Sequence, residues 1–259
     1  PTYLGICRML LVQAFPTQRS TLSVQEEEVL PYRASTLKAL STLLESIDVS
    51  IHGNEQKKSA FCFITKSLTP LFDPTADALP SGKEESPLIV SRAIDCFAAC
   101  FWEGFGAEQS GERYYNVLVL VQIFVQLSAL ERPWTVKTSS LQGCARLVSK
   151  IVPDTLKDHT TVATIVECAS LALKDRKFWK VRLAGLEVLH ALVSRCGKGI
   201  VDHNIQGTDP NVDNRQLILE AVLPQKEVIS TLTKQTLRDS EAKVTALASQ
   251  ILSSMTWWP

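Results

Sequence analysis

Residues 178–193 read FWKVRLAGLEVLHALV, and this stretch decides the fold class. A basic residue, Arg182, stands near its start, and the apolar residues Leu186, Leu189 and Val193 follow four, seven and eleven positions later. Side chains at this spacing share one face of an α-helix. The stretch therefore predicts an amphipathic helix whose first turn carries a tryptophan and a basic residue.

Residues 134–148, WTVKTSSLQGCARLV, repeat this arrangement, and three weaker copies occur elsewhere. The basic residues that mark the five copies are Arg33, Arg92, Lys137, Arg182 and Lys243. Successive markers are 59, 45, 45 and 61 residues apart. The two central spacings fall within the period of roughly 40 to 47 residues that two-helix repeats have. The sequence therefore predicts repeated helix pairs in which the marker lies near the start of the second helix.

Each of the two longer spacings requires an inserted segment, and the sequence supplies one in each place. Residues 73–87 and 197–214 are rich in proline, glycine and polar side chains, which is typical of surface loops. We therefore predict an all-α fold, an α-solenoid of about five helix pairs that cover one another's apolar faces. Residues 1–259 are expected to form a single solenoid segment of a longer protein.

The remaining periodic stretches predict the first helix of each pair, at residues 4–15, 55–72, 112–130, 158–173 and 215–237. Pro224 is expected to break or kink the last of these helices. Pro31 and Pro133 are expected at the starts of second helices, where a missing N–H costs little. Asp175 and Asp239 lie in predicted turns, and we expect the markers to pair with turn aspartates of their own or an adjacent pair. The alternative is a solvated marker, which would stabilise the fold little.

At residues 134–148 and 178–193 the chain resembles the HEAT-repeat superfamily. More narrowly, these two stretches resemble the C-terminal region of the large HEAT-repeat adaptor that binds the 26S proteasome. In that family a tryptophan–x–valine–basic start to the second helix is familiar in late repeats. The resemblance implies a non-catalytic protein that holds proteasome subunits and links them to other cellular components. It carries over no individual binding residue.

The composition favours protein partners in a reducing compartment. Lysine plus arginine and aspartate plus glutamate number 27 each, whereas nucleic-acid-binding proteins usually carry a basic excess. The seven cysteines include no Cys-x-x-Cys pair, which predicts free thiols and a cytoplasmic or nuclear location. The most apolar stretch, residues 117–130, is shorter than the roughly 20 residues that span a bilayer. We therefore expect neither nucleic-acid binding nor integral membrane association.

Motifs for catalysis, cofactors or metals are not evident. The histidines do not share a helical face at ligand spacing, and Cys96 and Cys100 lack the further ligands of a zinc site. Residues 196–199, CGKG, lack the strand and the Gly-Lys-Ser/Thr ending of a phosphate loop. We therefore expect a non-catalytic scaffold with no cofactor. Two alternatives stay open: a nuclear transport receptor or assembly chaperone of the HEAT/armadillo type, and a helical enzyme whose site is assembled only in three dimensions.

Two tryptophans, Trp257 and Trp258, follow the last predicted helix. The first interpretation is a cap over the final helix pair, because large aromatic side chains cover apolar surface well. The second is a contact with a partner or with further sequence. The sequence does not separate the two interpretations.

Overall fold

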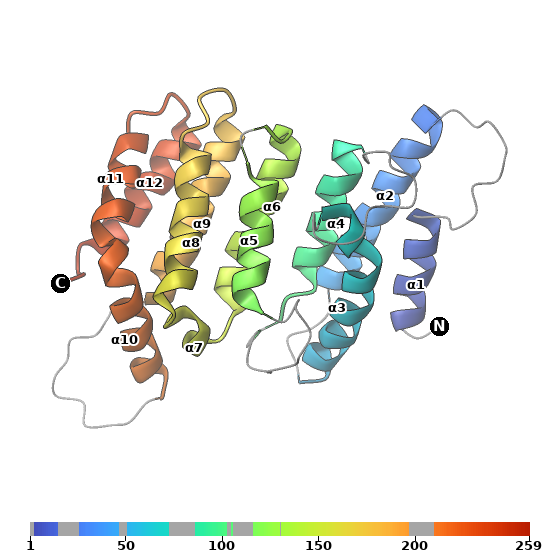
Figure 1. The fold of residues 1–259 in the computed structure, drawn as a ribbon, viewed down its shortest axis with the longest axis horizontal. Coiled ribbons are helices and arrows are strands. Elements are labelled where there is room, and N and C mark those ends of the chain that lie inside the picture. Colours follow the sequence, from blue (N-terminus) through green and yellow to red (C-terminus); the bar gives the residue numbers. More distant parts are fainter. Residues whose placement is uncertain are drawn as a thin grey trace. The chain divides into compact units, whose positions relative to one another are not determined.

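The computed structural model describes residues 3–14, 26–46, 51–72, 86–102, 105, 116–129, 131–196 and 210–259. The chain divides into two compact units, Pro1–Glu103 and Gly104–Pro259. Both units consist of helices packed in pairs (Figure 1). Within the described ranges, the only β-type pairing is one isolated bridge, between Phe105 and Ile151.

The described residues of the first unit form two helix pairs. Helix α1 (Tyr3–Ala14) packs against α2 (Glu26–Glu45), and α3 (Ile51–Phe72) packs against α4 (Pro87–Ala99). The second helices α2 and α4 also pack against each other, and so do the first helices α1 and α3. The unit is therefore a two-layer stack, and its apolar faces meet between the layers.

A cluster of aromatic rings fills the core of the first unit beside α3 and α4. The ring centroid of Phe61 lies 5.3 Å from that of Phe97, 6.1 Å from that of Phe101 and 5.8 Å from that of Trp102. All four side chains are buried. Tilted and edge-on ring pairs of this kind add stabilisation beyond the area that they remove from water.

Three helix pairs are formed by the part of the second unit that the structure describes. Their bounds are α5 (Val117–Leu127) with α6 (Trp134–Lys150), α8 (His159–Leu173) with α9 (Trp179–Cys196), and α11 (Lys226–Thr236) with α12 (Ala242–Met255). The short helix α7 (Pro153–Leu156) precedes α8, and α10 (Pro210–Val222) precedes α11. Helices α6, α9 and α12 pack side by side in one layer, and α5, α8 and α11 form the other (Figure 1).

Helices α8 and α9 approach each other closely because one contact residue is glycine. A Cβ atom placed on Gly185 would lie 2.8 Å from the Cβ of Ala172 and 3.2 Å from the carbonyl oxygen of Ala169. Ala169 and Ala172 are buried, and so are Ile165 of α8 and Leu189 of α9, each four residues along its helix from this contact. The second unit therefore has a continuous apolar core between its two layers.

Local sequence signals explain several helix boundaries. The side chain of Asn116 caps α5 by accepting from Leu118 N at 3.0 Å, and that of Asp158 caps α8 by accepting from Thr160 N and Thr161 N at 3.1 Å. Pro224 lies in a short 3₁₀ turn, Leu223–Gln225, that separates α10 from α11. The predicted helix 215–237 is therefore interrupted at its proline, as expected.

The predicted all-α class is confirmed, and each unit is a stack of helix pairs, the layer arrangement of an α-solenoid. Some predicted boundaries were wrong. Pro31 lies inside α2, because the helix begins earlier at Glu26. Helix α4 begins at Pro87 and α10 at Pro210, so the ends of the predicted loops 73–87 and 197–214 are helical. Residues 73–85 and 197–209 lie outside the described residues, and one continuous solenoid over 1–259 stays a prediction.

None of the described helices is both long enough and apolar enough to cross a membrane.

Candidate functional site

The candidate site is one edge of the second unit, where the two helices of each pair are joined. We define the turn edge as residues 131–137, 174–182 and 237–243, which comprise the last residues of the α5–α6 turn, the two later turns and the first residues of α6, α9 and α12. These segments are far apart in the sequence. The contacts described below show that each lies beside the next.

Asp175 organises the turn between α8 and α9. One carboxylate oxygen, Oδ1, accepts from the backbone N–H groups of Lys177 at 3.0 Å and Phe178 at 2.9 Å. The other, Oδ2, accepts from Lys137 Nζ of the preceding pair at 2.8 Å. Burial acts to raise the pKa of Asp175, but these hydrogen bonds and the lysine charge outweigh it and lower the pKa. The carboxylate therefore stays ionised and ties two helix pairs together.

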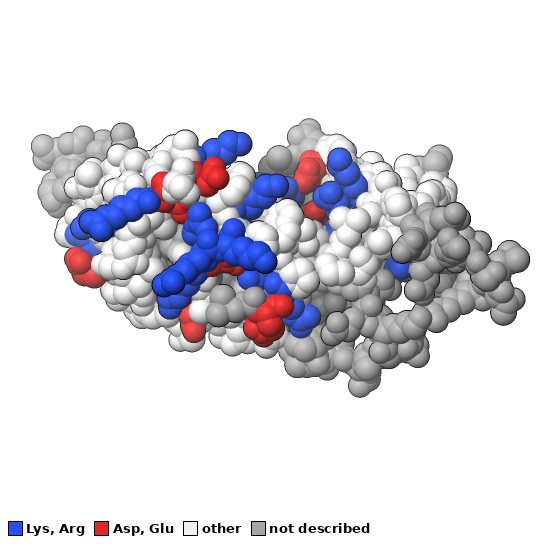
Figure 2. All heavy atoms as spheres, turned by 90° about the horizontal axis from the view of Figure 1, so that it is seen from above, with Lys and Arg blue, Asp and Glu red and all other residues white. Residues whose placement is uncertain are grey.

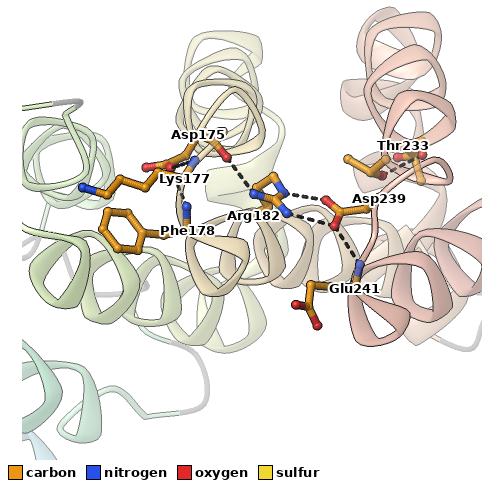
Figure 3. A network of polar contacts seen from close by, with 8 residues as sticks. Asp175, Lys177, Phe178, Arg182, Thr233, Asp239 and Glu241 are labelled. Carbon is orange, nitrogen blue, oxygen red and sulfur yellow. Dashed lines mark hydrogen bonds and ion pairs between the residues drawn. The ribbon is translucent and has the colours of Figure 1, made fainter.

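Arg182 makes the corresponding connection to the next turn (Figure 3). Its Nε donates to Asp239 Oδ2 at 2.5 Å and its NH2 donates to Oδ1 at 2.8 Å, a two-pronged pairing. Its NH1 donates to the backbone oxygen of Asp175 at 2.9 Å. The hydrogen bond with Asp239 raises the pKa of Arg182, and the same bond lowers the pKa of Asp239. One guanidinium thus bridges the turns of two successive helix pairs.

The two ion pairs are largely shielded from water. The side chains of Lys137 and Asp175 are 6% and 7% exposed, and those of Arg182 and Asp239 are 14% and 6% exposed. A buried ion pair adds little net stability over apolar residues, but the loss of one partner costs about 3–5 kcal/mol. Each pair therefore connects one helix pair to the next while adding little net stability over apolar residues at the same positions.

Aromatic rings and basic side chains alternate along the same edge. The rings of Trp134 and Phe178 stack with centroids 5.8 Å apart. The Nζ of Lys180 lies 5.0 Å from the centroid of Trp134 and 5.9 Å from that of Trp179, and the Nζ of Lys243 lies 6.0 Å from the Trp179 ring. These distances are those of cation–π contacts, so the half-buried rings hold the lysines in place.

The other sequence markers make different contacts. Arg33 Nε donates to the backbone oxygen of Ala14 at 2.7 Å and so connects α2 to α1. Arg92 pairs at 3.2 Å with Asp95 of its own helix, which differs from the expected turn aspartate. Asp95 lies one helical turn away on the same face, and this explains the difference. Lys243 is exposed and lies over the Trp179 ring. The equivalence of the five positions as repeat markers stays a prediction.

Trp257 and Trp258 lie against the last helix pair. Trp258 is 5% exposed, its backbone N–H donates to Met255 O at 3.1 Å, and its ring meets that of Trp257 edge-on at 6.1 Å. Lys226 Nζ donates to the backbone oxygens of Trp258, at 3.2 Å, and of Pro259. Both indole N–H groups are buried without an acceptor among the described residues. These contacts favour the cap interpretation for Trp258 and leave a partner contact as a prediction for the half-buried Trp257.

Three of the described cysteines, Cys96, Cys100 and Cys196, are buried in the apolar core. Burial raises the pKa of the Cys196 thiol to about 12 and also raises the pKa values of the Cys96 and Cys100 thiols. The Cys96 thiol donates to the backbone oxygen of Leu37 at 3.0 Å, as a packed core group does. The described residues contain no cluster of three or more His, Cys, Asp or Glu side chains that could hold a metal ion.

Sequence reasoning missed the contacts that end on backbone oxygens. Arg195 NH2 donates to Ile151 O at 2.7 Å and so connects the C-terminal end of α9 to that of α6. The partnership of Phe178 with Trp134 was also missed. The sequence did contain a signal for the Trp134–Phe178 pair, because Phe178 directly precedes Trp179. The acceptor of Arg195 has no signature in the sequence.

No family model matches the chain, and no curated protein matches it either. Among solved structures, it is similar to yeast importin-β, with a TM-score of 0.36 and 14% identity over 98% of this chain. The chain spans about a third (34%) of the length of that structure. A similarity this low identifies no family for the chain.

Proposed function

We propose that the chain is part of a non-catalytic scaffold that binds other proteins. The observation that carries this proposal is the turn edge, where buried ion pairs connect each helix pair to the next. Stacked helix pairs present a long surface through which many modest contacts can hold a large partner. The proposed location is the cytoplasm, the nucleus or both.

The partner that we propose is the proteasome, which makes the chain a fragment of a proteasome-binding adaptor. Support comes from residues 134–148 and 178–193, whose tryptophan–x–valine–basic starts resemble that adaptor family. The alternative is a nuclear transport receptor or assembly chaperone built from similar repeats. An acidic face would favour the alternative, whereas the turn edge of the second unit is basic. A helical enzyme is the least favoured alternative.

The proposal is tested with purified 26S proteasomes and the tagged chain on native gels. We expect the folded chain to migrate with the proteasome and to be recovered with it by affinity capture. A matched sample denatured before mixing controls for adhesion of exposed apolar surface. If the chain, folded by circular dichroism, fails to migrate with proteasomes at micromolar concentration, the proteasome assignment is wrong. Retention of import cargo in a parallel capture would favour the transport-receptor alternative.

A further inference from the structure

The turn edge concentrates exposed basic side chains in a chain whose net charge is zero. Figure 2 views the molecule from above and shows basic side chains gathered there. Glu131 is the only exposed acidic residue of the turn edge, and Glu241 is half-buried. The exposed basic residues are Arg132, Lys174, Arg176, Lys177, Lys180, Arg238 and Lys243.

The two turn aspartates do not neutralise these exposed cations. Asp175 is engaged by Lys137, and Asp239 by Arg182, so each carboxylate pairs with a shielded cation. The charge of the exposed basic residues therefore faces the solvent. A local excess of one sign attracts groups of opposite sign even when the net charge of the chain is zero.

Three of these basic side chains are also positioned in advance by aromatic rings. Lys177 Nζ lies 5.1 Å from the ring centroid of Phe178, and Lys180 and Lys243 lie over tryptophan rings. Each contact restricts a side chain that otherwise loses considerable rotamer freedom when it binds. Because part of this entropy is lost on folding, less is lost on association.

We infer that the turn edge binds an acidic segment, rich in aspartate or glutamate, of a partner protein. The inference rests on the proposed function, which supplies a protein as the partner. Carboxylates accept hydrogen bonds from both lysine and arginine, and the basic residues are distributed over three successive turns. An extended acidic peptide can follow this distribution along the edge.

The rings of the edge argue against single-stranded nucleic acid as the occupant. Proteins that bind single strands stack bases on available aromatic faces. Trp134 is already stacked on Phe178 and contacted by Lys180, and Trp179 is contacted by Lys180 and Lys243. The edge therefore offers charge and hydrogen-bond donors in place of stacking platforms.

The test measures binding of a fluorescent poly-glutamate peptide by anisotropy at low and at physiological salt. The variant is Arg176→Glu, and the matched control is Lys157→Glu, an equal change of charge at an exposed turn position outside the turn edge. Poly-glutamine, duplex DNA of similar charge and phosphatidylserine vesicles are the competing probes. Circular dichroism verifies that both variants are folded.

We expect poly-glutamate to bind, with affinity reduced roughly tenfold by Arg176→Glu and less than about twofold by Lys157→Glu. Added salt should weaken the binding. The inference is overturned if poly-glutamate does not bind, or if both variants weaken it equally. Tighter binding of duplex DNA or of vesicles, with the same dependence on Arg176, would also overturn it.

The native gel with proteasomes separates this inference from the proposed function. Proteasome retention without poly-glutamate binding would refute the acidic-segment inference and leave the proposed function intact. Poly-glutamate binding without proteasome retention would refute the proteasome assignment and keep the acidic-segment inference.

Discussion

Replacing Asp175 with asparagine should destabilise the protein by about 3 kcal/mol, far more than most exposed substitutions. Asparagine keeps an oxygen that can accept from the N–H groups of Lys177 and Phe178. It removes the negative charge that lies 2.8 Å from Lys137 Nζ. The lysine side chain is only 6% exposed. The cost arises because a buried ammonium is left without its counter-ion. Asp175→Ala also removes the turn hydrogen bonds, and its cost should rise by about 1 kcal/mol.

Urea denaturation followed by far-UV circular dichroism measures these changes in the free energy of unfolding. The control is Asp154→Asn, which breaks the solvent-exposed pair with Lys157 and should cost less than about 1 kcal/mol. A double-mutant cycle of Asp175→Asn with Lys137→Met should show a coupling of about 1–3 kcal/mol. The reasoning is refuted if Asp175→Asn costs no more than Asp154→Asn, or if the cycle shows no coupling.

Three further predictions concern helix packing, capping and pH. Gly185→Ala should lower the free energy of unfolding by about 1–2 kcal/mol, because its Cβ would lie 2.8 Å from that of Ala172. The cost of overpacking exceeds the gain in helix propensity. In urea denaturation, adding Ala172→Gly should restore part of the lost stability. Asp158→Ala should cost about 1 kcal/mol through loss of the α8 cap, whereas Asp158→Asn should change the urea midpoint little. Asp239 has a lowered pKa, so its contribution is present above the ordinary aspartate pKa and is lost as the pH falls below about 4. Urea midpoints measured against pH should fall less steeply in Asp239→Asn, and equal slopes would contradict this assignment.

Much of the fold followed from the sequence because apolar spacing records which face of a helix is buried. The spacing behind Lys137 and Arg182 placed α6 and α9 correctly, and Pro224 marked the break between α10 and α11. The predicted start of α2 was wrong because proline is best tolerated in the first turn of a helix, and Pro31 was therefore placed there. In the structure α2 begins five residues earlier, at Glu26, and continues through Pro31.

The contacts of the turn edge were only partly predictable. The phase of the repeat pointed to Asp175 and Asp239 because both lie in turns before a second helix. Arg92 instead pairs with Asp95, three residues later on the same helix. A carboxylate at this spacing competes with turn aspartates for the arginine. The partner of Arg195 is a backbone oxygen, and every residue carries one, so the sequence alone could not select Ile151.

The ion pairs along the turn edge give the second unit a direction. Each runs from a cation on one helix pair to an aspartate on the following pair, and the α8–α9 pair carries both halves, Asp175 toward its predecessor and Arg182 toward its successor. The α8–α9 pair therefore carries both contacts that it would need to pack against a copy of itself. If α8–α9 were duplicated in tandem with its connecting segment, the first copy's arginine would meet the position of Asp175 in the second. Because each pair would contact the next through the same ion pair, an array of this kind can lengthen by gene duplication and needs no new interface.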